Sequence, residues 1–136
     1  MVREKLLRRA ALVAFTLIVA SAAACRPSTP LKVATIQTGR SLNSDNSVGN
    51  HTTRFRPQDT MFVAILTDGA GSGTFVARWT YAGRQVSEDV KKVSYGDGAA
   101  TEFHIKNSSG FPPGEYAVEI LLDGKSIGSR TLRVEK

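Results

Sequence analysis

The feature that most constrains the fold of this chain is a series of short runs in which apolar and polar residues alternate. Residues 74–81 and 115–122 place an apolar side chain at every second position, and beyond residue 24 no stretch keeps a helical spacing for longer than a turn or two. Alternation with a period of two is typical of strands that bury one face. The sequence therefore predicts an antiparallel all-β protein.

Turn residues divide the chain into seven expected strands. Residues 60–67 are apolar on both faces, as expected of a central strand, whereas residues 85–95 carry four charged side chains and are expected at an exposed edge. Asp123-Gly124 is typical of a two-residue hairpin turn, and the Asn- and Ser-rich segment 43–53 is expected to be a loop. The expected strands are residues 32–38, 60–67, 74–81, 85–95, 100–106, 115–122 and 126–134.

Two aromatic residues sharpen this prediction toward an immunoglobulin-like sandwich. Seven short strands over roughly a hundred residues favour two packed sheets. Trp79 lies on the third expected strand, where an immunoglobulin-like domain places its core tryptophan. Tyr116 follows the turn at 112–114 and resembles a tyrosine corner, in which the hydroxyl bonds to upstream backbone.

Aliphatic residues stand where such domains carry an inter-sheet disulfide. These positions are Val63 or Ile65 on the second expected strand and Val118 on the sixth. Cys25 is the only cysteine of the chain, so no intramolecular disulfide can form. The fold is therefore expected to depend on core packing alone.

From Phe55 onward, the chain resembles a recurrent immunoglobulin-like domain of bacterial lipoproteins and secreted proteins. The resemblance implies a sandwich fold and an envelope location, and it supplies no catalytic residues, since most of the matching residues are turn glycines, core side chains and the corner tyrosine. The matching residues are 55–60 (FRPQDT), 77–79 (ARW), Gly83, Val86, 101–105 (TEFHI), 113–120 (PGEYAVEI) and 122–125 (LDGK).

The first 24 residues resemble a bacterial lipoprotein signal peptide. Four cations among residues 3–9 precede the apolar run 10–20, which is short for a bilayer-spanning helix. Small residues 21–24 then lead to Cys25, as in a lipobox, whose cysteine receives a diacylglycerol and becomes the new N-terminus. The alternative is a plain secretory signal followed by a chance cysteine, and Ala22 stands where lipoboxes more often carry Leu.

This resemblance implies three segments and a location. Residues 1–24 are expected to be the signal peptide, 25–31 the lipidated N-terminus with its Pro/Ser linker, and 32–136 the immunoglobulin-like domain. The acyl chains would anchor the protein to a membrane without spanning it. Arg26 after the cysteine, rather than Asp, favours the outer membrane by the sorting habit of enteric lipoproteins, so the domain is expected to face the periplasm.

The charge distribution argues against a nucleic-acid partner. The whole chain has a net charge of +6, but residues 1–24 hold four of the 18 Lys and Arg and one of the 12 Asp and Glu, which leaves a net charge of +3. Only Lys91 and Lys92 are adjacent cations in the expected domain. No basic stripe with interleaved aromatic residues is present, so nucleic-acid binding is not expected.

The sequence offers little catalytic chemistry. His51 and His104 are the only histidines, and a metal site would need both of them to converge with a carboxylate. Asn43, Asp45, Ser47 and Gly49 loosely mimic a calcium loop, but the glycine and the terminal acid of an EF-hand are misplaced, so an Asx-rich turn is the favoured interpretation. No nucleophile elbow or phosphate-binding glycine loop is present. We therefore expect no enzyme activity, no metal and no cofactor.

The expected function is that of a membrane-anchored, non-enzymatic binding or assembly module with an envelope protein or polysaccharide as its partner. The alternative is a periplasmic module that binds a small ligand or calcium. The candidate contact regions are the Asn-rich loop and an aromatic patch of Tyr81, Tyr95 and Phe111 at one end of the sandwich. The alternative for these aromatic residues, which we favour, is ordinary packing at turns. The candidate contact residues are Asn43, Asp45, His51, Tyr81, Tyr95 and Phe111.

Overall fold

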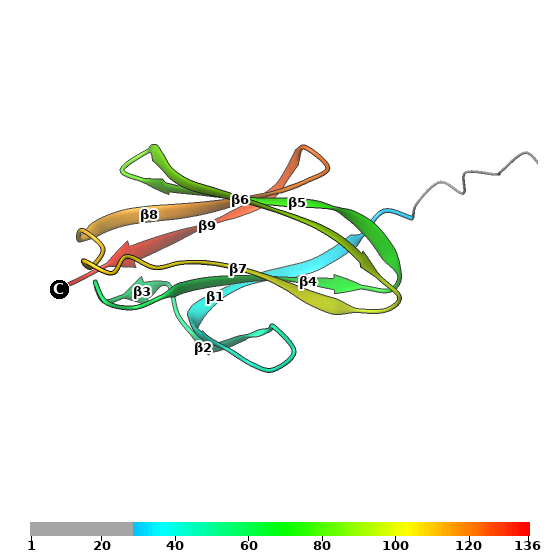
Figure 1. Cartoon of the computed structure of the whole chain (residues 1–136), viewed down its shortest axis with the longest axis horizontal. Helices are drawn as coiled ribbons and strands as arrows, with labels where there is room; N and C mark the ends of the chain where they lie inside the picture. Colours follow the sequence, from blue (N-terminus) through cyan, green and yellow to red (C-terminus); the bar gives the residue numbers. More distant parts are fainter. Residues whose placement is uncertain (1–28) are drawn as a thin grey trace, which may run out of the picture.

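The expected strands assemble into two sheets that face each other around one core, in a computed structural model that describes residues 29–136 (Figure 1). The expected signal peptide, Cys25 and most of the expected linker lie outside the described residues. The strands are β1 (Lys32–Leu42), β2 (Val48–His51), β3 (Arg54–Phe55), β4 (Met61–Asp68), β5 (Gly71–Tyr81), β6 (Arg84–Tyr95), β7 (Ala99–Ile105), β8 (Gly114–Leu122) and β9 (Lys125–Val134).

The strand order confirms the prediction of an all-β sandwich. One sheet has the order β2-β1-β4-β7 and the other has the order β3-β9-β8-β5-β6. All neighbouring strands are antiparallel except the short pair β3 and β9. β4 is a central strand, and β6 lies at an edge, as their residue patterns predict.

The segment 43–53 was expected to be a loop, and this prediction is wrong for residues 48–51, which form β2. β1 continues to Leu42, beyond its expected end at residue 38, and pairs with β2 in the register Gly39↔His51. Val48 is 2% exposed and packs against Gly39, where a Cβ would overlap its side chain. Burial of Val48 thus stabilises the hairpin of β1 and β2, although the polar composition of this segment predicts a loop.

The core lies between the sheets and contains the residues that alternation placed there. Phe75, Ala77 and Trp79 on β5 are fully buried, and Phe103 on β7 faces them from the other sheet. Val63, Ile65 and Val118 are also fully buried. Packing of aliphatic side chains therefore occupies the positions at which related sandwiches place a disulfide.

Tyr116 forms the predicted tyrosine corner. The residue is 3% exposed, and its hydroxyl donates a hydrogen bond to the carbonyl oxygen of Pro112 at 2.8 Å. The bond spans four residues and fixes the turn that leads into β8. Local sequence and tertiary packing thus agree at this position.

The two ends of the described chain lie at opposite ends of the sandwich (Figure 1). Residue 29 lies at the same end as the turns that follow β4, β6 and β8, while the C-terminus lies at the other end. We call this second end, with the turn 82–83 and the loop 106–113, the distal end. Among residues 29–136, no helix could cross a membrane.

Candidate functional site

A cleft of about 770 Å³ opens at the distal end, between the edge strands β6 and β7. We call it the distal cleft. Both strands are the last of their sheets, so the cleft occupies the open side of the sandwich and the loop 106–113 closes its end. The lining residues are Tyr81, Val86, Ser87, Asp89, His104, Ile105, Lys106, Asn107, Ser108, Phe111, Pro112 and Tyr116.

Three aromatic rings form one wall of the distal cleft. Tyr81 and Tyr116 stack with their ring centroids 4.6 Å apart, and Phe111 meets Tyr116 edge-on at 5.6 Å. The Tyr81 hydroxyl donates to the carbonyl oxygen of Pro113 at 3.0 Å, next to the bond made by Tyr116. Burial, and then the neighbouring Tyr81, raise the pKa of Tyr116. The stacking and the two hydrogen bonds hold the wall in place, and the raised pKa keeps the Tyr116 hydroxyl a neutral donor.

Polar side chains line the rest of the distal cleft. Asn107 holds its own loop in shape, because its side-chain oxygen accepts from the backbone N–H of Ser109 and its carbonyl accepts from Gly110. Asp89 is exposed on β6 and makes no ion pair with any residue in the range 29–136. A rigid apolar wall opposite free polar groups is the usual composition of a binding pocket.

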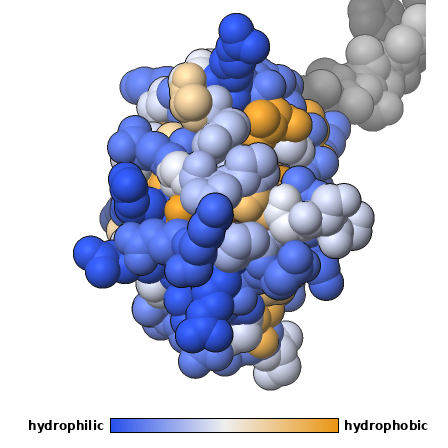
Figure 2. Space-filling view, turned by 90° about the vertical axis from the view of Figure 1, so that its left-hand side faces the viewer, coloured by the Kyte–Doolittle hydropathy of each residue, from blue (hydrophilic) through white to orange (hydrophobic). Residues whose placement is uncertain are grey.

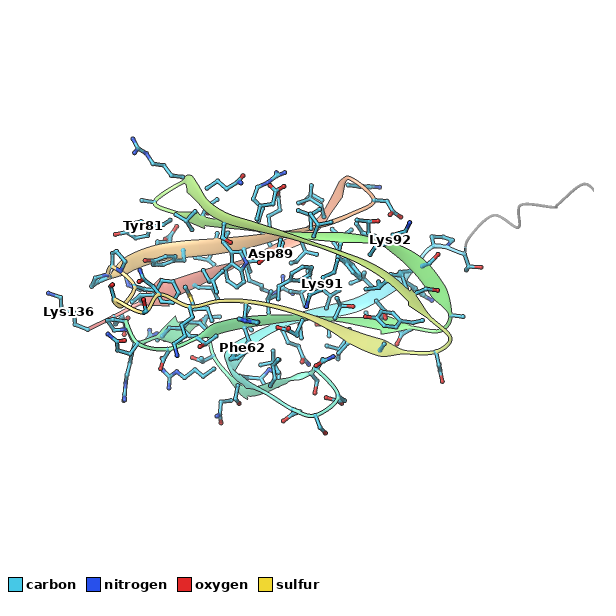
Figure 3. The ribbon with its side chains drawn as sticks, viewed as in Figure 1. Phe62, Tyr81, Asp89, Lys91, Lys92 and Lys136 are labelled. Carbon is cyan, nitrogen blue, oxygen red and sulfur yellow. The ribbon has the colours of Figure 1, made fainter. Side chains whose placement is uncertain are left out.

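A charged cluster joins the two sheets beside the distal cleft. Lys91 donates to both the carbonyl and the carboxylate of Glu102, and His104 Nδ1 lies 3.0 Å from the other carboxylate oxygen. The Lys91 ammonium also lies 5.0 Å from the centroid of the Phe103 ring. Figure 3 shows Asp89 and Lys91 extending from β6 into the space between the sheets.

This cluster shifts the titration of Glu102. Burial raises the pKa of its carboxyl group, but the hydrogen bonds and positive charges of His104 and Lys91 outweigh burial, so the pKa is lowered. Glu102 is thus held as a carboxylate. Its carboxylate contacts Lys91 and His104. Because Lys91 lies on β6 and Glu102 on β7, the ion pair between them joins the two edge strands.

The comparisons with known proteins identify the fold. No protein-family model matches this sequence, and no curated protein is a significant match. An immunoglobulin-like protein from Pseudomonas aeruginosa matches with a TM-score of 0.55 and 10% sequence identity, over 79% of this chain and 98% of that protein. The fold is immunoglobulin-like. This confirms the fold predicted from Trp79 and Tyr116.

Two further solved structures share the fold within much longer chains. One is a cycloisomaltooligosaccharide glucanotransferase from Paenibacillus sp. in complex with cycloisomaltoheptaose, with a TM-score of 0.53 and 17% identity. The other is an alkylpurine DNA glycosylase from Pseudomonas fluorescens bound to DNA, with a TM-score of 0.52 and 13% identity. The matches cover 80% and 79% of this chain but only 14% and 31% of those chains. At these identities the likeness shows the fold alone.

The structure does not bring the candidate aromatic residues Tyr81, Tyr95 and Phe111 together in one patch. Tyr81 and Phe111 meet at the distal cleft, but Phe111 is 7% exposed and belongs to its wall. Tyr95 lies at the opposite end of the sandwich, because β6 runs the whole length between the pairs Tyr81↔Arg84 and Gly71↔Tyr95. There Tyr95 bonds to the Thr101 hydroxyl at 2.6 Å.

The polar groups of the Asn-rich loop are largely bonded to one another. Asp45 Oδ1 accepts from the N–H and the hydroxyl of Ser47, and these bonds lower the pKa of Asp45. The Asn43 amide donates to the Ser47 hydroxyl and to the Val48 carbonyl. Asp45 also lines a second hollow with Tyr95. These contacts describe an Asx-type turn that ends β1.

The two histidines do not converge. His51 is exposed at the end of β2 and lines a shallow hollow with Arg130, whereas His104 lies on β7 at the distal cleft. Within residues 29–136, no three His, Cys, Asp or Glu side chains are grouped so as to hold a metal ion.

Sequence reasoning missed the charged residues of β6 that face inward. Asp89 and Lys91 occupy strand positions opposite the buried Ala77 and Phe75. The sequence already showed charged residues at alternating positions of this strand that would otherwise face the core. Inward-pointing charges are a known means of protecting an edge strand from pairing. That signal, rather than the aromatic residues alone, marks this side of the sandwich.

Proposed function

We propose that this chain is a non-enzymatic binding module of the bacterial envelope, tethered by lipid on Cys25, that holds its partner in the distal cleft. One observation carries the proposal. The described chain begins at one end of the sandwich, and the distal cleft lies at the other end (Figure 1). Attachment near residue 29 therefore leaves the cleft unobstructed.

The linker length is consistent with a closely held domain. Six residues, 26–31, separate Cys25 from β1, and at full extension they span at most about 20 Å. Leu31 is already buried in the core. A lipid on Cys25 would therefore keep the domain near the membrane surface, within reach of other envelope components.

The contacts within the domain favour binding over catalysis. Nucleophilic catalysis requires a nucleophile within hydrogen-bond reach of a base that a third group orients. In the part of the chain from 29 to 136, neither histidine bonds to a serine or threonine hydroxyl, and the His104 ring is paired with Glu102 instead. The distal cleft thus offers recognition groups: a stacked aromatic wall, a free carboxylate at Asp89, and amide and hydroxyl groups.

The face that a partner would meet is polar. Figure 2 shows the distal end covered mostly by hydrophilic residues, with apolar side chains in small, separate patches. A partner recognised there would be met by hydrogen bonds around a small apolar centre, as in many non-obligate complexes. This composition suits a hydrated envelope protein or polysaccharide.

The tether is tested by comparing the wild type with Cys25→Ala. In fractionated cells, the wild-type protein should be in the membrane fraction and carry a lipid on a new N-terminal cysteine, as determined by mass spectrometry. Cys25→Ala should be released from the membrane. Equal partition of the two proteins would refute the tether and leave the cleft to be tested alone.

The cleft is tested by blocking it with a bulky side chain. Ser108→Arg fills an exposed position of the distal cleft, and Ser129→Arg makes the same change on exposed β9, outside it. After crosslinking in native membranes and purification, a component held by the wild type and Ser129→Arg should be lost from Ser108→Arg. Equal recovery from both variants would refute the cleft as the binding site.

A further inference from the structure

We propose that two copies of this chain associate by antiparallel pairing of their β6 strands about a two-fold axis at Val90. This inference concerns the outer edge of β6. It does not rest on the function proposed above, but it uses the Asp89 carboxylate that also lines the distal cleft, so a paired β6 would leave that carboxylate engaged. Its starting point is that β6, a strand of 12 residues, pairs with β5 alone. One row of its backbone donors and acceptors therefore has no partner strand.

The middle of β6 is regular and accessible. Its register with β5 is unbroken from Gly73↔Val93 to Trp79↔Ser87. Val86 and Val90 are 53% and 61% exposed, and they are the large apolar side chains left most open to solvent in the described range. An exposed, regular edge strand is a template for another strand.

The side chains of β6 divide between its two faces. Asp89 and Lys91 point toward the four-stranded sheet, and Lys92 points away from it (Figure 3). A strand that pairs with β6 must place residues of the same face opposite each other. For two identical antiparallel strands, this requires the two-fold axis to pass through a residue.

An axis at Val90 makes β6 complementary to itself. Val90 then faces Val90 of the second copy. On the outer face Glu88 lies opposite Lys92, and on the inner face Asp89 lies opposite Lys91. By symmetry each of these opposite-charge pairs forms twice, which places four such pairs around one apolar contact. Glu88 and Lys91 would share these contacts with Arg78 and Glu102, their partners within one copy. Opposite charges at directly paired positions stabilise a sheet, and like charges destabilise it.

The neighbouring registers are disfavoured. An axis at Asp89 or at Lys91 places two like charges directly opposite each other, and so does an axis at Glu88 or at Lys92. The charges of this edge strand therefore disfavour the two registers on either side of Val90, and the axis at Val90 is the one that pairs all four charges with opposite charges. A charge pattern that specifies a single register is a recognised means of selecting a strand partner.

The apolar contact at the axis extends an existing row. Val90 lies beside Val76 on β5, and Val76 lies beside Leu121 on β8, all on the outer face. Pairing at Val90 would continue this row into the second copy. Two of the charges are also available for new partners, since neither Asp89 nor Lys92 makes an ion pair within residues 29–136.

Attachment to one membrane is compatible with this pairing. The strands of the two copies run in opposite directions, so their N-terminal ends lie at opposite ends of the pair. Both linkers can reach the same membrane when the strands lie along its surface, because six residues span about 20 Å and the sheets are about 10 Å apart. Confinement to a surface also raises the effective concentration of the two copies.

A cysteine at the axis tests the proposal in the full chain in its native membranes. With the axis at Val90, the Cα atoms of the two residues 90 lie about 5 Å apart, which a disulfide can bridge, whereas those of the two residues 88 lie about 14 Å apart. Val90→Cys should form a crosslinked dimer under mild oxidation. Glu88→Cys on the same exposed face is the matched control, and the wild type reports any crosslink through Cys25.

Charge reversal tests the register. In the Val90→Cys background, Lys92→Glu places like charges opposite each other twice and should lower crosslinking about tenfold. Adding Glu88→Lys should restore it in part, because this change recreates the opposite-charge pairs but also removes the ion pair of Glu88 with Arg78. Lys125→Glu, the same change at a distant turn, should leave crosslinking unchanged. Equal crosslinking of Val90→Cys and Glu88→Cys, or no response to Lys92→Glu, would overturn the proposal.

Discussion

The rings of Tyr81 and Tyr116 stack with their centroids 4.6 Å apart, and their hydroxyls donate hydrogen bonds to the carbonyl oxygens of Pro113 and Pro112, respectively. The two rings are direct cross-strand partners in the register of β5 and β8. Two adjacent strands, β5 and β8, therefore each supply one hydrogen bond to the turn at residues 112–114. The rigidity of the distal cleft depends on this arrangement, because the turn forms the end of its aromatic wall.

We expect the two hydroxyls to contribute unequally to stability. Tyr116→Phe should lower the free energy of unfolding by about 1 kcal/mol, because it removes a hydrogen bond from a buried residue. Tyr81→Phe should cost less, since its hydroxyl is exposed and water can replace it at the Pro113 carbonyl. Urea unfolding of both variants and the wild type measures the difference. A larger loss for Tyr81→Phe would contradict this ranking.

The buried indole of Trp79 yields a second prediction. Its Nε1 is buried and has no hydrogen-bond partner within residues 29–136. Trp79→Ala should cost roughly 3–5 kcal/mol through the cavity it leaves. Trp79→Phe should cost less than about 2 kcal/mol, because the loss of packing is partly offset by removing an unsatisfied donor.

Thermal and urea unfolding of the two Trp79 variants provide the test. Fluorescence cannot be used as the common probe, since Trp79 is the only tryptophan, so circular dichroism should follow the transition. A loss for Trp79→Phe as large as that for Trp79→Ala would show that the indole N–H has a partner, such as a bound water.

The seven longer strands, β1 and β4 to β9, were predictable because each has a local signal in the sequence. Alternation in β5 and β8 identified the core faces, and Trp79 and Tyr116 identified the sandwich type. β2 and β3 have no such signal. They are held by single anchors, Val48 and Phe55, whose burial depends on residues far away in the sequence. Composition alone therefore predicted a loop across 43–53.

The candidate site was predicted less well, since alternation assigns a residue to a face but not to an end. Tyr81 ends β5 at the turn into β6, and Tyr95 is the last residue of β6, so the length of β6 separates the two tyrosines. The cleft also requires β7 to lie beside β6, which is a property of the topology. The charged residues Asp89 and Lys91 at inward-facing positions could have indicated the side of the sandwich on which the cleft lies, but the sequence analysis considered the aromatic residues instead.

The contact between Gly39 and Val48 yields a third prediction. A Cβ on Gly39 would overlap the Val48 side chain and the carbonyl oxygens of residues 49 and 50. Gly39→Ala should therefore displace β2 and destabilise the domain by roughly 1–3 kcal/mol. Hydrogen exchange should show faster exchange in residues 48–51. Gly96→Ala is the control, because nothing lies within 4 Å of its Cβ, and it should leave exchange at β2 unchanged.

The inter-sheet tie at Glu102 yields the last prediction, which concerns pH. Because His104 and Lys91 lower the pKa of Glu102 below its ordinary value of 4.5, the folded state favours the carboxylate. The stabilisation is fully present above pH 4.5 and is lost as the pH falls through the lower pKa of the folded state. Glu102→Gln, which cannot ionise, should lack this dependence.

At about pH 7, Glu102→Gln should be less stable than the wild type by on the order of 1 kcal/mol, and the difference should shrink toward zero by about pH 3. Denaturant unfolding across this range measures it. Glu119→Gln is the control, because it removes an exposed ion pair with Arg78 on the outer face and should change stability little. A difference for Glu102→Gln that persisted undiminished in acid would mean that the carboxylate charge does not tie β6 to β7.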